Sequence, residues 1–303
     1  IKTGNLVGQM VEDFPAVGDW VSLSVYDPDF SVIHNILPRF SMISRQAVGK
    51  FGEVQIIGTN IDYAFLVQAA DRDFNINRLE RYLTICYSSK VTPKIVLTKI
   101  DLADGERIAE IKRGIGQRIE DVEVIAVSNE TRAGYDDLRR SIEKGKTYCM
   151  LGSSGVGKST LLNNLSGRAI MRTDVISAST NKGRHITSHR ELIVLESGGI
   201  LIDNPGMRDV GIVDSGGGLE ETFDKILFYS EGCRFRDCTH TKEVGCAVIE
   251  GVESGEIDKK SYENYLKAER EKAHFEQSAA ERRKRDKGFG KIVKHYKKYM
   301  KDK

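Results

Sequence analysis

The chain has 303 residues, 40% of them hydrophobic, with 29 glycines and 5 prolines. This composition excludes collagen-like and wholly disordered proteins, and the length predicts two or three domains that can each bury a core. The formal net charge of +2 conceals an uneven distribution. Residues 282–303 hold eleven basic and two acidic side chains, whereas residues 1–281 are acidic overall. Such a tail is typical either of a solvated helix face or of an arm that contacts phosphate backbones.

Membrane and secretory segments are not expected. The sequence has no run of about 18 apolar residues, and its first ten residues lack the basic and apolar regions of a signal peptide. We therefore expect a cytoplasmic protein with no membrane partner. A monomer is the default expectation, because no self-complementary apolar surface can be recognised in one sequence.

Short β-strands are predicted for residues 1–60, which we expect to form the first domain. Apolar and polar residues alternate over Val21–Tyr26, and apolar stretches recur at Val32–Leu37 and Val54–Ile57. Turn-forming residues such as Asp27-Pro28-Asp29 separate them. Short strands divided by turns favour a small all-β barrel.

An α/β domain is predicted for residues 61–218, because apolar strands there alternate with helical stretches. The strand candidates are Ala64–Val67, Lys94–Leu97, Val122–Val127, Tyr148–Leu151 and Ile200–Ile202. This pattern indicates a parallel sheet with helices on both faces, which binds its ligands beyond the carboxyl ends of the strands. The Gly-rich segment Asp214–Gly218 is the expected linker to a helical third domain at residues 219–303.

A phosphate-binding loop is predicted between the strand at Tyr148–Leu151 and a helix that begins near Thr160. Its sequence is Gly152-Ser153-Ser154-Gly155-Val156-Gly157-Lys158-Ser159. In such a loop the glycines let backbone N–H groups surround a phosphate, and the helix N-terminus adds positive potential. Lys158 is expected to bridge the β- and γ-phosphates, and Ser159 to offer its hydroxyl to Mg²⁺.

A second phosphate-side motif follows the strand at Ile200–Ile202. Asp203 ends this strand, and Gly206 comes three residues later. The carboxylate of Asp203 can hold Mg²⁺ through water, and the N–H of Gly206 can meet a γ-phosphate.

Two earlier strand ends resemble the guanine-reading loops of GTPases. They are Thr98-Lys99-Ile100-Asp101 and Ser128-Asn129-Glu130. A carboxylate at Asp101 can accept hydrogen bonds from guanine N1–H and N2–H₂, whereas adenine lacks this pair of donors, so we expect GTP rather than ATP. GTPases ordinarily place the phosphate loop before the guanine motifs, and here the guanine motifs come first. The chain therefore resembles a circularly permuted GTPase, in which the segment after Asp203 leads directly into the C-terminal domain.

A metal site is predicted in the third domain. Cys233, Cys238, His240 and Cys246 lie within fourteen residues and supply three thiolates and one imidazole. Four such ligands are typical of a closed tetrahedral Zn²⁺ site with a structural role, and ordinary buried cysteines are the alternative interpretation.

These features together resemble the ribosome small-subunit-dependent GTPase family of bacteria and plastids. The resemblance covers nearly the whole chain. It is carried by Val17-Gly18-Asp19-Trp20-Val21, Ile36-Leu37-Pro38-Arg39, the permuted GTPase motifs, Gly183-Arg184-His185-Ile186-Thr187 and the Cys/His cluster. It implies an N-terminal OB-fold, GTP hydrolysis stimulated by the small (30S) ribosomal subunit, and a role in late maturation of that subunit. The implied partners are the 30S subunit with its 16S rRNA and GTP or GDP, and the implied cofactors are one structural Zn²⁺ and Mg²⁺ with GTP.

The resemblance also assigns the switch-one threonine. Thr187 corresponds to the residue that meets Mg²⁺ and the γ-phosphate, alongside the predicted ligands Ser159 and Asp203. Thr180 is a competing candidate, because Ile186 interrupts the family's usual run of threonines.

Catalysis is assigned less directly. His185 corresponds to the histidine proposed to assist the attacking water, with His189 as a competing candidate and an uninvolved surface histidine as the alternative. Met207 stands where Ras-like GTPases carry a glutamine that orients water. Because a thioether cannot do this, hydrolysis without a partner should be slow. Thr98 also departs from the family pattern, replacing the commoner asparagine.

Two parts of the chain are candidate RNA-binding elements. OB-folds bind nucleic acid across one sheet face. In the basic tail, Phe289, Ile292, Val293, Tyr296, Tyr299 and Met300 form one helical stripe, which is more typical of core packing than of recognition. Two other functions stay open: a binding protein with incidental turnover, suggested by Met207, and a P-loop ATPase or kinase, against which Asp101 argues.

Overall fold

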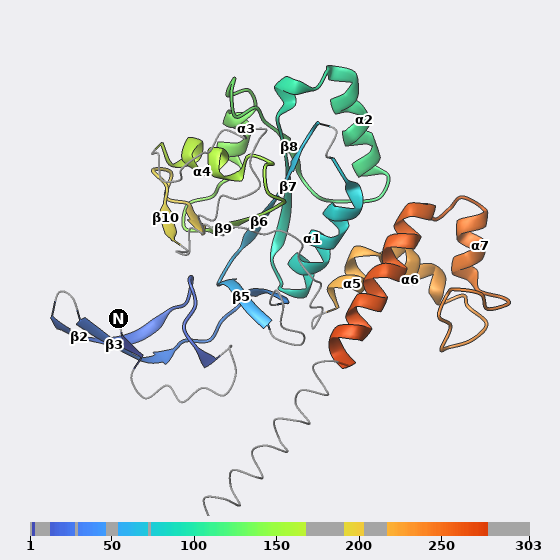
Figure 1. Cartoon of the computed structure of the whole chain (residues 1–303), viewed down its shortest axis with the longest axis horizontal. Helices are drawn as coiled ribbons and strands as arrows, with labels where there is room; N and C mark the ends of the chain where they lie inside the picture. Colours follow the sequence, from blue (N-terminus) through green and yellow to red (C-terminus); the bar gives the residue numbers. More distant parts are fainter. Residues whose placement is uncertain are drawn as a thin grey trace, which may run out of the picture.

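A six-stranded sheet forms the centre of the computed structural model, which describes residues 2–3, 13–27, 30–46, 54–71, 74–167, 191–202 and 217–277 (Figure 1). In spatial order its strands are β10 (Leu192–Val194), β11 (Ile200–Ile202), β9 (Thr147–Leu151), β6 (Tyr63–Ala69), β7 (Thr92–Thr98) and β8 (Val124–Ala126). Neighbouring strands run parallel, except that β10 is antiparallel to β11. The five strands predicted for this part of the chain and the parallel sheet are therefore confirmed.

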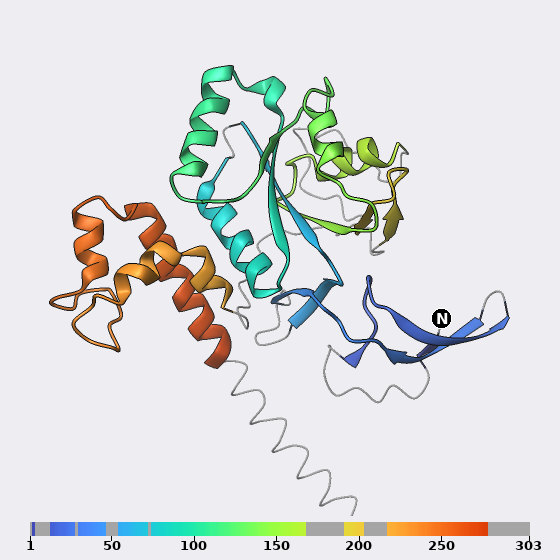
Figure 2. The same ribbon diagram turned by 180° about the vertical axis from the view of Figure 1, so that it is seen from behind.

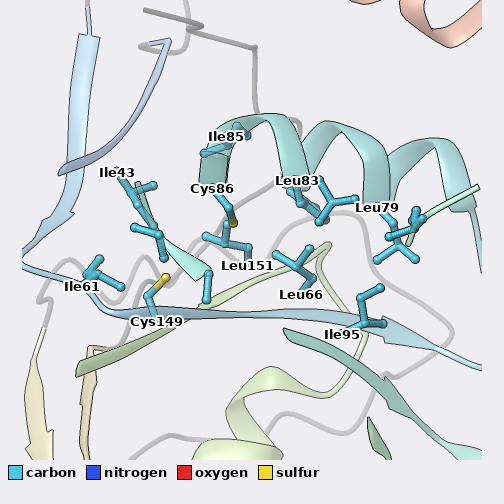
Figure 3. Packing of buried hydrophobic residues seen from close by; sticks show 14 of the residues in the cluster. Ile43, Ile61, Leu66, Leu79, Leu83, Ile85, Cys86, Ile95, Cys149 and Leu151 are labelled. Atoms are coloured by element: carbon cyan, nitrogen blue, oxygen red, sulfur yellow. The ribbon is translucent and has the colours of Figure 1, made fainter. Parts of the chain in front are cut away.

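Helices cover both faces of the sheet. Successive residues of a strand point to opposite faces, so neighbouring residues of one strand pack against different helices. The helices are α1 (Ile76–Ser88), α2 (Gly105–Gly116), α3 (Tyr135–Arg140) and α4 (Lys158–Ser166). Ala64 and Leu66 of β6 join the hydrophobic cluster of α1 and α2, whereas Phe65 and Val67 join that of α3 and α4. Figure 3 shows the first cluster, with Leu83 of α1 pointing toward Leu66. Each fully buried side chain of this size stabilises the fold by about 1.5–3 kcal/mol.

The N-terminal strands form two smaller sheets. One contains β1 (Lys2–Thr3), β2 (Val21–Asp27) and β3 (Phe30–Ile36), and the other pairs β4 (Met42–Gln46) with β5 (Val54–Thr59). Strands are thus confirmed where alternation predicted them, and the OB-fold stays a prediction.

An ion pair of 2.7 Å between Asp19 and Arg39 connects two sequence motifs of this N-terminal region. Burial alone would raise the pKa of Asp19, but hydrogen bonds from Arg39 and from the Ala16 N–H lower it below its ordinary value. The two motifs lie 20 positions apart and meet through this contact.

Helices follow the central sheet and build a hydrophobic cluster of their own. They are α5 (Gly218–Thr222), α6 (Asp224–Ser230), α7 (Ala247–Glu253) and a helix over residues 259–277. Leu219, Phe223 and Ile226 are among its buried residues. Figures 1 and 2 both show these helices beside α1, away from α3 and α4. Among the described helices, none combines the length and apolarity needed to cross a bilayer.

The expected linker ends inside a packed interface. Gly217 is the N-cap of α5, and Gly218 is its buried first residue. A Cβ on Gly218 would lie 2.2 Å from the backbone oxygen of Thr84, so only glycine lets α5 approach α1 this closely. These two glycines therefore belong to the interface between domains, and residues 214–216 lie outside the described part.

A buried charged group joins α1 to the C-terminal helices. Glu80 is 1% exposed and forms an ion pair of 2.7 Å with Arg118, which follows α2. Its carboxylate also accepts hydrogen bonds from Asn264 Nδ2, at 2.6 Å, and from Ser261 Oγ, at 3.0 Å. Burial raises the pKa of Glu80, and Arg118 opposes this rise. The carboxylate is thus held by partners from both sides of the interface.

Candidate functional site

The carboxyl ends of β6, β7, β8 and β9 lie along one edge of the sheet, because these strands are parallel neighbours. The phosphate loop follows β9, and the two guanine-type motifs follow β7 and β8. The structure therefore brings together three motifs that the sequence spreads over more than sixty positions. A ligand that spans a base and a phosphate chain can contact all three.

The phosphate loop turns sharply into α4. Gly157 is the N-cap of α4 with φ of +93°, a left-handed conformation that favours glycine, and a Cβ here would lie 2.5 Å from the side-chain nitrogen of Asn129. Lys158 folds back over the loop, and its Nζ donates to the backbone oxygens of Gly152 and Ser153, each at 2.6 Å. Ser159 follows in the first turn of α4. The amino end of the helix and the ammonium group therefore both present positive potential at this edge.

Thr98 ties the first guanine-type motif to the phosphate loop. It is the last residue of β7 and fully buried, and its hydroxyl donates to the backbone oxygen of Val156 at 2.6 Å. The replacement of the family's commoner asparagine by threonine thus still leaves a donor for this carbonyl.

Asp101 and Ser128 come from different strand ends and meet directly. Ser128 Oγ donates to Asp101 Oδ1 at 2.5 Å, and it accepts from the backbone N–H groups of Glu130 and Thr131. Ser128 is fully buried, whereas Asp101 is exposed. The Ser128 hydroxyl therefore orients the Asp101 carboxylate, which is exposed to solvent.

Lys99 directly follows Thr98 in the chain, and its backbone has a left-handed conformation with φ of 57°. Its Nζ forms an ion pair of 3.0 Å with Asp71, just beyond β6. The side chain thus links the loop after β7 to the loop after β6.

Asn129 lies in the predicted motif Ser128-Asn129-Glu130, although no binding role was predicted for its own side chain. Its side-chain nitrogen donates to the backbone oxygen of Gly157 at 3.0 Å, joining the loop after β8 to the phosphate loop. The sequence gives a weak signal, because an amide directly after Ser128 occupies a loop already expected to carry function.

The predicted residues of the switch regions lie outside the described part of the chain. These are His185, Thr187, Asp203 and Gly206, together with the competing candidates Thr180 and His189 and with Met207. The basic tail beyond residue 277 also lies outside it. Of the expected Mg²⁺ ligands, only Ser159 belongs to a described element.

The four predicted zinc ligands converge at the start of α7. Their ligand atoms all lie within 4.8 Å of one another. The sulfurs of Cys233 and Cys246 are 3.8 Å apart, and each lies 3.5 Å from Nδ1 of His240. A tetrahedral zinc with bonds of about 2.3 Å to sulfur and about 2.0 Å to nitrogen separates its ligands by roughly 3.5–3.8 Å. The donor set and its spacing therefore fit a tetrahedral zinc ion.

The loop that carries these ligands is held from two sides. Glu243 accepts hydrogen bonds from the Thr239 hydroxyl and from the backbone N–H groups of Thr239, Thr241 and Lys242, and the hydroxyl contributes most to the lowering of its pKa. The Tyr262 hydroxyl donates to the backbone oxygen of His240 at 2.5 Å. Cys246 itself is the N-cap of α7 and 2% exposed. The loop is thus shaped by hydrogen bonds as well as by its ligand set.

Comparison with protein families gives one clear match. A family described as RsgA GTPase matches residues 36–213. "Small ribosomal subunit biogenesis GTPase RsgA 1" of Bacteroides thetaiotaomicron is 41% identical over 299 residues, covering 98% of this chain and 83% of the relative. A protein of Listeria monocytogenes, "Small ribosomal subunit biogenesis GTPase RsgA 2", is 41% identical over 274 residues, covering 90% of this chain and 77% of the relative.

Solved structures agree with this match. YjeQ from Thermotoga maritima has a TM-score of 0.64 and 26% identity, covering 86% of this chain and 85% of that one. YloQ, described as a circularly permuted GTPase, has a TM-score of 0.61 and 28% identity, covering 86% of this chain and 81% of that one. The permuted arrangement predicted from the motif order is therefore confirmed.

Proposed function

The chain belongs to the RsgA GTPase family and is a GTP-hydrolysing enzyme, and we propose that it acts in late maturation of the small (30S) ribosomal subunit, which stimulates its hydrolysis. The relatives are named as biogenesis GTPases of that subunit. The observation that carries the proposal is the meeting of the phosphate loop with Thr98, Asp101 and Ser128 at one sheet edge.

Guanine is selected, in this proposal, by Asp101. Its carboxylate accepts from guanine N1–H and N2–H₂, a donor pair that adenine lacks. The Ser128 hydroxyl and Lys99 hold the loops on either side of the base, and the contact of Thr98 with Val156 keeps base and phosphates at a fixed separation. The site therefore favours GTP and GDP over adenine nucleotides.

The phosphates are bound by residues 152–160. Backbone N–H groups of the loop and Lys158 neutralise the β- and γ-phosphates, and the hydroxyl of Ser159 holds Mg²⁺. Thr187 and Asp203 complete the Mg²⁺ ligands, and the N–H of Gly206 meets the γ-phosphate. The bound Mg²⁺ supplies the charge that stabilises the leaving phosphate oxygens.

Hydrolysis requires a positioned water molecule that attacks the γ-phosphate, and we assign His185 as the residue that assists this water. Met207 provides no group that can orient this water, so the free protein turns over slowly. Docking on the subunit brings His185 and Thr187 into their catalytic positions, which links GTP hydrolysis to binding of the subunit.

RNA contact is assigned to an OB-fold at residues 1–60 and to the C-terminal domain at residues 219–303. Trp20 and Tyr26 support the first assignment, because their side chains are 69% and 65% exposed and exposed aromatic side chains can stack on bases. One structural Zn²⁺ stabilises the C-terminal domain through Cys233, Cys238, His240 and Cys246. The partner is the 16S rRNA of the subunit, and the protein works as a cytoplasmic monomer.

The test is steady-state GTP hydrolysis by the purified protein, alone and with 30S subunits, 50S subunits or free rRNA. We expect strong stimulation by 30S subunits only. The Lys158→Ala variant is the control for contaminating GTPases and should show no stimulated turnover. Equal stimulation by 50S subunits would contradict the proposal.

The switch assignments are tested separately. His185→Ala and Thr187→Ala should abolish stimulation while GDP affinity stays within about twofold, because GDP lacks the γ-phosphate that these residues serve. Tight, guanine-specific binding with no stimulation by any subunit would instead identify a nucleotide-dependent binding protein.

A further inference from the structure

A network of neutral side chains, partly buried and centred on the buried Tyr135, lies next to the predicted nucleotide site. Asn129, in the loop after β8, donates from Nδ2 to the backbone oxygen of Gly157 at 3.0 Å. Its Oδ1 accepts from the hydroxyl of Tyr135, the first residue of α3, at 2.7 Å. Tyr135 is 2% exposed, and its hydroxyl accepts from Asn164 Nδ2 of α4, also at 2.7 Å. Four residues thus connect the base-side loop, the phosphate loop, α3 and α4.

The hydrogen bonds of this network have only one consistent direction. The carbonyl of Gly157 can only accept, so the amide nitrogen of Asn129 faces it and the amide oxygen faces Tyr135. Burial raises the pKa of Tyr135, so the phenol is neutral near pH 7 and its one proton goes to Asn129. Asn164 then donates both to the Tyr135 hydroxyl and, at 3.2 Å, to the backbone oxygen of Asn129. The Asn129 amide is therefore held at both ends: its nitrogen donates to the Gly157 carbonyl, and its oxygen accepts from the Tyr135 hydroxyl.

The surroundings of Tyr135 hold its ring in place. The guanidinium groups of Arg132 and Arg139 lie over the ring, 5.4 and 5.8 Å from its centre. The ring also belongs to the same hydrophobic cluster as Leu138 and Leu161. A hydroxyl on a ring held this firmly can set the position of a loop.

We propose that Tyr135 is a positioning residue for guanine selection, which acts through Asn129 to hold the base-side loop at a fixed distance from the phosphate loop. The inference rests on the proposed nucleotide site and on the resemblance of the loop Ser128-Asn129-Glu130 to the GTPase loop that meets guanine O6, a contact that we assign to a backbone N–H of this loop. A nucleotide has a fixed length between base and phosphates, so the loops that bind its two ends must be fixed relative to each other. The direct tie between them in this part of the site is the contact from Asn129 to Gly157.

The experiment compares Tyr135→Phe with Tyr148→Phe. Tyr148 lies in the same hydrophobic cluster and is fully buried, but its hydroxyl contacts Glu143 N and Ser141 O rather than a nucleotide loop. Each variant keeps the ring and removes one buried hydroxyl. The measurement is the dissociation constant for GDP, 6-thio-GDP and IDP, by calorimetry with Mg²⁺ present.

Tyr135→Phe should weaken GDP binding about tenfold, the effect of leaving one buried acceptor without its donor. 6-Thio-GDP carries sulfur, a poor acceptor, in place of O6, so it should lose less affinity and the preference for GDP over 6-thio-GDP should shrink. IDP lacks only the amino group read by Asp101, so the preference for GDP over IDP should stay constant. Tyr148→Phe should leave all three constants within about twofold of the wild-type values.

Equal weakening for GDP and 6-thio-GDP would show a merely structural role and overturn the inference. So would an unchanged GDP constant, or a wild type that binds GDP and 6-thio-GDP equally. If Tyr135→Phe does not fold, Asn164→Ala carries the same test, with an expected loss of about threefold and the same change in preference. A wild type that fails to prefer GDP over ADP would instead contradict the proposed function.

Discussion

The central sheet domain and the C-terminal helical domain are stabilised in different ways. The sheet domain has two hydrophobic clusters, one on each face, built from strands and helices of the whole domain. In the described part of the C-terminal domain there is one smaller cluster. Three of the helices that build it, α5, α6 and α7, have only 5, 7 and 7 residues, and they pack with the longer helix over residues 259–277. Helices this short are not stable alone, and a small core needs an additional cross-link. We therefore expect the sheet domain to be stabilised mainly by burial, and the C-terminal domain to depend also on a metal ion held by its Cys/His cluster and on its contact with α1.

The largest expected effect is the loss of a zinc ligand. Cys246→Ser removes one of the four predicted ligands. In small zinc domains the free energy of metal binding, on the order of 10 kcal/mol, is coupled to folding. We expect bound zinc to fall from one equivalent to near zero, with rapid proteolysis of the C-terminal domain and unchanged GDP affinity. Elemental analysis, limited proteolysis and GDP titration measure these three quantities.

Cys86→Ala is the matched control, because Cys86 is equally buried but lies in the cluster of α1 and the sheet. It should keep its zinc. A Cys246→Ser protein that retains a full equivalent of zinc would exclude Cys246 as a ligand.

The second effect concerns the charged junction between the two domains. Arg118→Met leaves the buried carboxylate of Glu80 without its charged partner, which costs about 3–5 kcal/mol. Urea denaturation should show this loss at pH 8. Replacing both residues, in Glu80→Leu with Arg118→Met, should recover part of it, because no buried charge is left.

The same variant has a predictable pH dependence. Burial already raises the pKa of Glu80, and removal of Arg118 raises it further. A carboxyl with a raised folded-state pKa is protonated more readily in the folded than in the unfolded protein, so its folded form gains stability as the pH falls. The destabilisation by Arg118→Met, measured against wild type at each pH, should therefore be smaller at pH 5.5 than at pH 8. A loss that grows on acidification would contradict this account.

A third and smaller effect distinguishes the nucleotide site from the junction of the two domains, because a change in the site should lower GDP affinity and a change in the junction should lower stability. Thr98→Val removes the donor to the Val156 carbonyl, at a cost of about 1–3 kcal/mol, and we expect this mainly as a GDP affinity lower by about tenfold or more. Thr84→Val removes another fully buried hydroxyl, which bonds to Thr222 across the junction on α1. It should lower the unfolding midpoint and leave GDP affinity unchanged. The opposite pattern would mean that the two hydroxyls have been assigned to the wrong regions.

The smallest effect is expected at Lys99. Its ion pair with Asp71 is partly exposed, so Lys99→Met should change the free energy of unfolding by only about 0.2–1 kcal/mol. The difference should vanish in 1 M salt, because exposed charges are screened. Thermal denaturation at low and high salt measures both quantities, and a salt-independent loss would point to packing of the lysine stem instead.

Local chemistry made much of the protein predictable. Apolar runs predicted five of the six described strands of the central sheet, all except β10, and the phosphate loop and the zinc ligands each lie in one short segment of the chain. The order of the motifs also gave the permutation. The assignments of His185 and Thr187 came from the resemblance, and those of Asp203 and Gly206 from their places after the strand Ile200–Ile202. All four remain predictions.

What sequence could not give are contacts between distant positions that carry ordinary residue types. Glu80 meets Asn264 across 184 positions, and nothing in an amphipathic helix marks one glutamate for burial. Gly218 belongs to a run of glycines typical of a linker, yet it allows two helices to touch. The orientation of the Asn129 side-chain amide depends on Tyr135 of α3, whose hydroxyl in turn accepts a hydrogen bond from Asn164 of α4.

The sequence by itself determined the strand and helix pattern, the family and the chemical types available to the site, because these depend on periodicity and on short motifs. Only the tertiary structure decided which of these groups touch. A hydrogen bond or an ion pair depends on distances of about 3 Å, and such distances between remote residues are set by the packing of the whole fold.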